Sequence, residues 1–238
     1  MEPYLFSGVV LPERAQLSLK FALKFSQLGS EKIAVAKVSI LLNQIAVWIE
    51  SEHDWNIFDL RNVVKNIVQN HLAMAGYLKG YAYDFEITRV LSQSREIDYV
   101  FGIDVPCLAE NGQSVELEEA LPKLAVKTLG PNGLLLNRCF SDLVSAMKHA
   151  DDTGFYCYRA IESLWNHCAV AHGLSAANKT EKWKKFREIS GSEEHTLRTI
   201  KSAADPLRHG NATAVSSEDR ASLLTSTWTV VDGYLNAI

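Results

Sequence analysis

The sequence predicts an α+β protein, with an antiparallel sheet and one covering helix in its first half and an all-α helical bundle in its second half. Two periodicities predict this class. Apolar residues alternate with polar ones through much of the region before residue 106, which is the two-residue period of a half-buried strand. From about Val115 to Ile238 this pattern gives way to a period of three to four residues, which is typical of amphipathic helices.

The clearest predicted strand runs from Leu17 to Phe25, where every second residue is apolar. One face of such a strand is buried and the other is solvated, as an antiparallel sheet allows. The apolar stretch from Ile33 to Ile49 is expected to hold two further strands, with a turn at Asn43-Gln44. Alternation returns in residues 81–87 and 97–105, and we expect these two segments to pair with each other.

One amphipathic helix interrupts the strands. Its apolar residues recur from Ile57 to Leu78, and Gly80 provides a stop signal. We expect it to cover the sheet, with His71 on its apolar face as a packed, hydrogen-bonded side chain. The segment from Pro106 to Gln113 lacks periodicity and contains Pro, Asn and Gly, which indicates a connection. The predicted domains are therefore residues 1–112 and 113–238.

The second domain is expected to contain five helices. The first follows Pro131-Asn132-Gly133, and the second is capped by Asp152 or Thr153 and ends at Gly173. The third spans Ala177 to Ile189, and the fourth begins near Ser192. We expect Pro206 to disturb the fourth helix, because proline lacks a backbone donor. The last helix begins with an approximate capping box at residues 216–219 and continues to the C-terminus.

Composition and charge limit the classes of function. The formal net charge of -4 gives no global positive field, so binding to nucleic acid would require a local patch. Charges interrupt every hydrophobic stretch before it reaches membrane-spanning length, and no secretory leader is recognisable. We therefore expect a cytoplasmic protein with no membrane partner. The four cysteines lack zinc-site spacing, so we expect reduced core cysteines, no metal and no cofactor.

The polar segment from Ala204 to Asn211, between two strong helical patterns, is the best candidate for chemistry. His209 can exchange a proton near neutral pH, and Arg208 presents a fork of donors that fits phosphate oxygens. Such a pair suits metal-free RNA cleavage, with the imidazole as acid or base and the guanidinium neutralising charge on phosphorus. The alternative is a polar loop in which Asp205 forms an ion pair with Arg208 or His209.

Two segments, Phe155–Leu164 and Leu207-Arg208-His209-Gly210, resemble the HEPN superfamily in its abortive-infection-like form, over roughly Leu134 to Ile238. The resemblance implies an all-α bundle that dimerises through its helices and cleaves RNA without a metal. It also implies a prokaryotic defence or toxin system. The family motif is Arg-x(4-6)-His, often followed by Gly, and the motifs of two subunits face one another across a shared cleft.

His209 matches the family histidine, but residues 202–204, where the arginine is expected, are Ser, Ala and Ala. Arg208, Arg198 or Arg159 could supply the missing guanidinium, or the nuclease could be inactive. Glu162 lies on the apolar stripe of its helix and needs a partner there. It could join the active-site network or form a structural salt bridge, and Arg159 lies one turn before it.

The densest basic run surrounds Trp183 and is assigned, with Asn211, as the candidate RNA-binding set: Lys182, Lys184, Lys185 and Arg187. The alternative is an ordinary solvated helix face.

The leading hypothesis is thus a HEPN-type ribonuclease or toxin that acts on RNA as a homodimer. Its N-terminal domain would sense a trigger or bind a regulatory protein. An inactive HEPN-like module that binds a partner protein, nucleotide or RNA is the second hypothesis, and a structural assembly subunit is the third.

Overall fold

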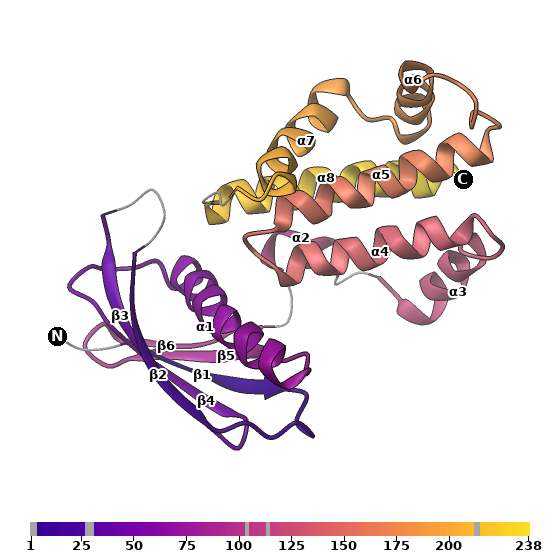
Figure 1. Ribbon diagram of the computed structural model, residues 1–238. Coiled ribbons are helices and arrows are strands. Elements are labelled where there is room, and N and C mark those ends of the chain that lie inside the picture. The colour runs from indigo at the N-terminus through magenta and orange to yellow at the C-terminus, as the bar shows by residue number, and fades with distance from the viewer. Residues whose placement is uncertain (1–3, 27–30, 103–104, 113–114, 212–214) are drawn as a thin grey trace. The chain divides into compact units, whose positions relative to one another are not determined.

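The chain divides into two compact units, Met1–Ile103 and Asp104–Ile238, of which the computed structural model describes residues 4–26, 31–102, 105–112, 115–211 and 215–238 (Figure 1). A six-stranded antiparallel sheet forms the first unit, and helices form the second. The predicted α+β class is therefore confirmed.

The sheet has the strand order β2-β3-β4-β1-β5-β6. Its strands are β1 (Tyr4–Leu11), β2 (Leu19–Ser26), β3 (Ile33–Leu41), β4 (Gln44–Glu50), β5 (Asp84–Ser92) and β6 (Ile97–Val100). The predicted pairing of the last two strands is confirmed, with Arg89 opposite Val100. The turn between β3 and β4 lies at Leu42-Asn43, one residue before the predicted turn, and both residues have positive φ. Of the last expected strand, β6 includes only residues 97–100, and Ile103 lies outside the described residues.

Strand β1 was not predicted from the sequence, and it lies near the middle of the sheet between β4 and β5. Its residues are buried or half-buried at every position, so the strand lacks the polar face that an alternating pattern requires. Gly8 marks a register shift against β5, where a Cβ would lie 1.8 Å from the carbonyl oxygen of Glu86. A glycine is therefore needed at this close approach of two backbones.

Helix α1 (Ile57–Lys79) covers one face of the sheet, as predicted (Figure 1). Asn56 caps its first turn through its side-chain oxygen, and Gly80 ends it with a φ of 69°. The buried stripe advances by four residues at each step and passes through Leu72 and Gly76. The apolar stripe expected from the sequence therefore differs from the buried stripe in the last turns of α1, where Met74 and Leu78 are 55% and 81% exposed.

The expected connection after the sheet is wrong, because residues 106–112 form helix α2 (Pro106–Gly112). Proline is tolerated at the first helical position, where no intrahelical donor is required. The backbone carbonyl of Val105 accepts hydrogen bonds from the amides of Leu108 and Ala109, which starts the helix. Helix α3 (Leu117–Lys127) was also not anticipated, and it buries none of its side chains.

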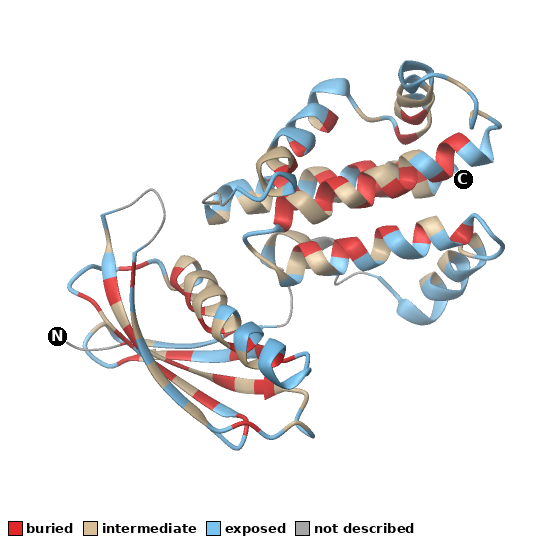
Figure 2. Cartoon of the chain, in the orientation of Figure 1, coloured by how far each residue is buried: buried red, intermediate tan, exposed pale blue. Residues whose placement is uncertain are grey.

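The remaining helices are α4 (Gly133–Lys148), α5 (Thr153–Ala171), α6 (Lys179–Ser190), α7 (Glu194–Arg208) and α8 (Ser217–Ala237). Helix α5 packs against α4, α6, α7 and α8 and has the most continuous buried surface (Figure 2). Asp152 occupies its N-cap position without a side-chain hydrogen bond. The hydroxyl of Thr153 instead donates to the carbonyl of Ala146, so this residue joins the start of α5 to the end of α4. Within the described residues, no helix is both long and apolar enough to cross a membrane.

Candidate functional site

The C-terminal end of α7 presents the two residues of the predicted centre to solvent. The expected disturbance by Pro206 is wrong, because α7 continues through this residue to Arg208. The proline lies in the last turn, where the loss of one amide donor removes little of the hydrogen-bond ladder. His209 occupies the C-cap position, and Gly210 follows with a φ of 76°. The chain thus leaves the helix directly after Arg208 and His209, both of which are exposed.

Arg208 is held above α5 without being enclosed. Its Nη1 lies 3.7 Å from Oδ1 of Asp205, and the two side chains are 41% and 44% exposed. Its guanidinium carbon also lies 5.6 Å from the centre of the Tyr158 ring. A long, half-exposed ion pair contributes little to stability, so the guanidinium keeps donors that an incoming anion can use.

Tyr158 connects this guanidinium to Glu162. Burial, together with the nearby Glu162 carboxylate, raises the pKa of Tyr158 to about 12, whereas Arg208 opposes this rise. The phenol therefore stays protonated, and the Glu162 carboxylate, one turn later on α5, lies close enough to act on it electrostatically. The structure thus brings Glu162 and Arg208 to the same tyrosine.

Arg159 points away from this group of residues and towards α4. Its Nη2 lies 3.3 Å from Oδ1 of Asp142, whose side chain is only 6% exposed. Burial raises the pKa of Asp142, and the nearby Arg159 partly offsets that rise. Successive helical residues are rotated by about 100°, which explains why neighbours on α5 face different helices. Arg159 is engaged in a structural ion pair and is not brought to His209.

Arg198 is also separate from His209 within one chain. It is hydrogen-bonded to Glu194 and its side chain is 76% exposed. The two residues are separated along α7 by about 16 Å, at a rise of about 1.5 Å per residue. Of the three arginines considered for the missing guanidinium, Arg208 is therefore the one that lies beside His209.

The candidate RNA-binding residues of α6 are partly committed to contacts within the protein. Lys182 donates to the carbonyl of Ser175 at 2.8 Å, whereas Lys185 and Arg187 lie 3.4 and 3.5 Å from carboxylates. Lys184 is exposed and makes no hydrogen bond or ion pair with residues that the structure describes. The set therefore retains positive charge, but most of its members already have a partner.

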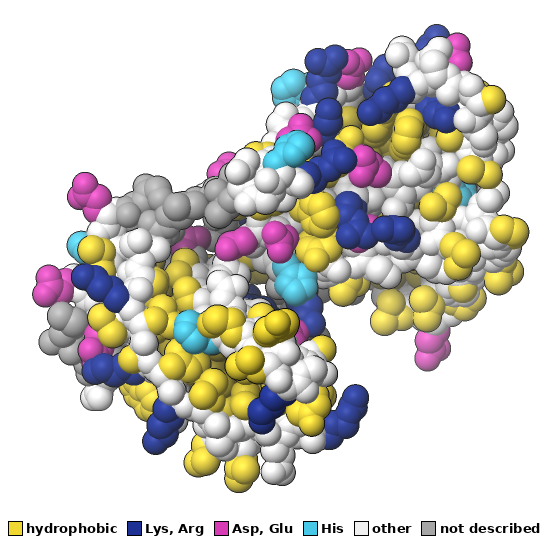
Figure 3. Space-filling model, in the orientation of Figure 1, with side chains coloured by type: hydrophobic (Ala, Val, Ile, Leu, Met, Phe, Trp, Pro, Cys, Tyr) yellow, Lys and Arg dark blue, Asp and Glu magenta, His cyan; other side chains and the backbone are white. Residues whose placement is uncertain are grey.

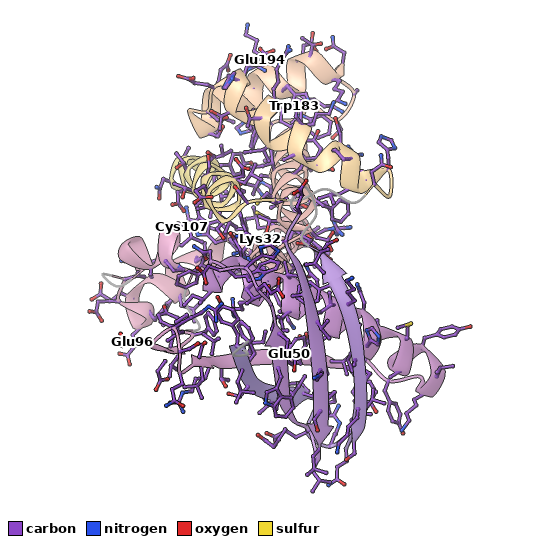
Figure 4. All side chains as sticks on the ribbon, turned by 90° about the vertical axis from the view of Figure 1, so that its left-hand side faces the viewer. Lys32, Glu50, Glu96, Cys107, Trp183 and Glu194 are labelled. Carbon is purple, nitrogen blue, oxygen red and sulfur yellow. The ribbon has the colours of Figure 1, made fainter. Side chains whose placement is uncertain are left out.

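Helix α6 lies at the other end of α7 from His209. The carboxylate of Glu194, in the first turn of α7, forms an ion pair with Arg187 of α6 and so links the two helices. Figure 4 shows Trp183 and Glu194 at the same end of the helical unit. Trp183 stacks on Trp165 with ring centres 5.2 Å apart, which fixes α6 against α5. Basic side chains, with acidic ones among them, gather over α6 and α7 in Figure 3.

The remaining predicted residue, Asn211, is exposed, and its backbone amide donates to the carbonyl of Pro206 at 3.0 Å. This hydrogen bond closes the turn that carries His209. The His209 side chain itself forms no hydrogen bond or ion pair with the described residues. An exposed, unengaged imidazole beside a guanidinium can bind a phosphate and exchange a proton with it or with a neighbouring hydroxyl.

Sequence reasoning did not place two residues in this region. Tyr158 was noted only as one residue of the Phe155–Leu164 segment, and its position beside Arg208 depends on how α5 packs on α7. Asp142 gave no signal beyond being an acidic residue within an apolar helical pattern, which is a sign of a buried pair. Among the described residues, no group of three His, Cys, Asp or Glu side chains is arranged to hold a metal.

The fold and this site define a two-unit α+β protein whose helical unit carries an exposed histidine-arginine pair. Two family models, described as the N-terminal and C-terminal domains of DUF8168, a domain of unknown function, match residues 4–101 and 121–238. Together the models cover most of the chain, which belongs to the DUF8168 family. Comparisons with curated proteins and with solved structures found no match.

Proposed function

We propose that the helical unit is a metal-independent endoribonuclease with His209 as its acid-base group and Arg208 as its phosphate ligand. The observation that supports this most is the exposed imidazole at the end of α7, unengaged among the described residues and adjacent to a guanidinium that is half exposed. Its resemblance to HEPN nucleases at the Leu207–Gly210 segment points in the same direction.

In the proposed reaction, the imidazole of His209 removes the proton of a ribose 2′-hydroxyl. The freed oxygen attacks the adjacent phosphorus, and the bond between phosphorus and the 5′-oxygen breaks. That oxygen takes a proton from a second imidazole, so the products are a 2′,3′-cyclic phosphate and a 5′-hydroxyl. Arg208 donates to the non-bridging oxygens, where negative charge increases in the transition state.

The second imidazole would come from His209 of another copy of the chain. One subunit offers a single histidine at the end of α7, whereas the reaction uses one base and one acid. A homodimer that places the two α7 ends face to face would supply both. The N-terminal unit would then regulate the nuclease by binding a protein partner or sensing a trigger, as in a prokaryotic defence or toxin system.

The test is RNA cleavage by the full chain in the presence of a chelator. His209→Ala should reduce the rate by at least about 100-fold, the usual contribution of a general acid or base. His195→Ala is the matched control, because His195 is also exposed on α7 but lies at its opposite end. Equal activity in both variants and the native protein would exclude His209 as the acid-base group.

A second candidate function is an inactive HEPN-like module that binds RNA, a nucleotide or a partner protein. Two observations favour it. No basic residue occupies positions 202–204, and Asp205 and Glu162 lie close enough to Tyr158 and Arg208 to offset the single positive charge there. In this case fluorescence anisotropy would detect RNA binding that Arg208→Ala weakens, with no cleavage by any variant.

A further inference from the structure

Charged side chains form a row along one flank of α7. Glu194, Arg198, Lys201, Asp205 and Arg208 are spaced alternately by four and three residues. At about 100° per residue, these five positions lie within an arc of about 80° on the helix surface. The buried residues Leu197, Ile200 and Ala204 lie on the neighbouring side, which packs on the bundle. The row therefore runs along the helix beside its packed face and ends next to His209.

The row begins with a carboxylate shared by two guanidiniums. Glu194 lies 3.5 Å from Arg187 of α6 and is hydrogen-bonded to Arg198 of its own helix. These hydrogen bonds and charges lower the pKa of Glu194, so the group is ionised at neutral pH and the three side chains together carry one net positive charge. Glu194 holds the two arginines in place but cannot neutralise both. This group can therefore bind a phosphate with guanidinium donors that remain unused.

Lys201 continues the row towards the catalytic end. It is exposed, and it makes no hydrogen bond or ion pair with any residue in the described parts of the chain. Arg208 ends the row with its weak contact to Asp205. Three cations thus follow one another along α7, and the two acidic residues of the row, Glu194 and Asp205, are each engaged with an arginine.

We infer that this row is a binding track for the backbone of single-stranded RNA, leading from the group around Glu194 to the bond cleaved at His209. The inference rests on the proposed function and extends it by naming the form and length of the substrate. Arg198 and Arg208 are separated by about 15 Å along the helix. A stacked strand advances by about 3.4 Å per nucleotide, so the three cations of the track would lie beside a run of about four to five consecutive phosphates.

The experiment compares cleavage of a dinucleotide with cleavage of an eight-nucleotide single strand by the full chain. The longer substrate should be cleaved with a higher kcat/KM, because it reaches Lys201 and Arg198. Lys201→Glu should lower kcat/KM for the longer strand about tenfold, through KM, and leave dinucleotide cleavage unchanged. Lys123→Glu, the same charge reversal at an exposed position on α3, should affect neither substrate.

The salt dependence provides a second measurement. Removing one phosphate contact with Arg198→Ala should reduce the slope of log affinity against log salt concentration by about one for the longer strand. Affinity is measured with an oligonucleotide that carries a 2′-deoxyribose at the cleavage position, so that it binds without reacting. A kcat/KM that does not depend on substrate length would exclude the track. Equal effects of Lys201→Glu and Lys123→Glu on cleavage of the longer strand would exclude it as well.

Failure of the nuclease proposal gives a different result. If the native chain cleaves no substrate of either length, the proposed chemistry is wrong, whereas the track is still tested by the binding series. Affinity that increases up to about five nucleotides and falls in Lys201→Glu supports the track even then. Affinity that is independent of length and of Lys201 excludes it, whether or not the protein cleaves RNA.

Discussion

The replacement of Arg159 by methionine separates a structural role for this arginine from a catalytic one. Arg159 lies 3.3 Å from Asp142, whose carboxylate is 6% exposed and has one oxygen without a hydrogen-bond partner among the described residues. Loss of one partner of a buried ion pair typically costs about 3–5 kcal/mol, because a charge remains buried without compensation. Arg159 is itself 32% exposed, so solvent screens part of the interaction. We therefore expect a loss of about 2–3 kcal/mol in the stability of the helical unit.

The effect should depend on pH in a defined direction. Burial already raises the pKa of Asp142 above its ordinary value, and without Arg159 the pKa rises further. A group whose pKa is higher in the folded state takes up its proton first in that state, so acidification favours folding. The loss caused by Arg159→Met should therefore be smaller at pH 5 than at pH 7. The double variant Asp142→Asn, Arg159→Met should recover most of the stability at both pH values.

The assay is urea unfolding of the full chain, followed by far-ultraviolet circular dichroism. With a slope of about 2 kcal/mol per molar urea, the transition of the helical unit should move down by about 1 M in Arg159→Met. Arg198→Met is the control, because it removes an arginine from an exposed pair and should cost at most about 0.5 kcal/mol. A native unfolding midpoint combined with lost RNA cleavage would refute the structural role of Arg159.

Three further changes test the account of stability. Burial and the nearby His172 lower the pKa of His167, whose Nδ1 lies 2.7 Å from the Tyr234 oxygen. The stability of the fold should therefore be constant above about pH 7 and fall as the pH drops below about 6.5. Thermal unfolding of His167→Gln should lack this pH-dependent loss of stability. Arg220 donates from Nη2 to the carbonyl of Met147 at the end of α4. Arg220→Ala should therefore lower the free energy of unfolding in urea by about 2–3 kcal/mol, and Arg220→Lys should recover part of it. An unchanged unfolding midpoint would exclude a stabilising role for this hydrogen bond. Gly8→Ala would place a Cβ 1.8 Å from the carbonyl oxygen of Glu86. The free energy of unfolding of the sheet unit should fall by about 2 kcal/mol or more. Native stability in this variant would contradict the observed register between β1 and β5.

The sequence predicted the elements that bury one face and expose the other to solvent. It missed β1 and α3, which do not have this division. Alternation from Leu17 to Phe25 identified β2 because one face of this strand packs inward and every second residue is exposed on the other. The residues of β1 carry no such alternation, since this strand is at least half-buried throughout and has apolar side chains on both of its faces. Helix α3 was missed for the opposite reason, because no residue in it is buried and its apolar residues define no packed stripe.

The candidate site was predictable where it depends on local sequence. Arg208 and His209 stand out because polar residues and Gly210 follow a helical pattern, and the structure places both at the end of that helix. The separation of Arg159 and Arg198 from His209 depends instead on helix packing and on the length of α7, which spacing in sequence did not reveal. The same holds for Tyr158, whose contact with Arg208 joins residues from α5 and α7.

If His209 and Arg208 act together on an RNA phosphodiester bond, the cleaved RNA must carry two particular chemical ends. A labelled single-stranded RNA, incubated with the full chain in chelator and analysed by mass spectrometry, should yield fragments that end in a 2′,3′-cyclic phosphate and begin with a 5′-hydroxyl. The same fragments should be absent with His209→Asn and strongly reduced with Arg208→Lys, which keeps the charge but loses the fork of donors. Intact RNA with the native protein, or cyclic-phosphate ends that persist in His209→Asn, would contradict the account.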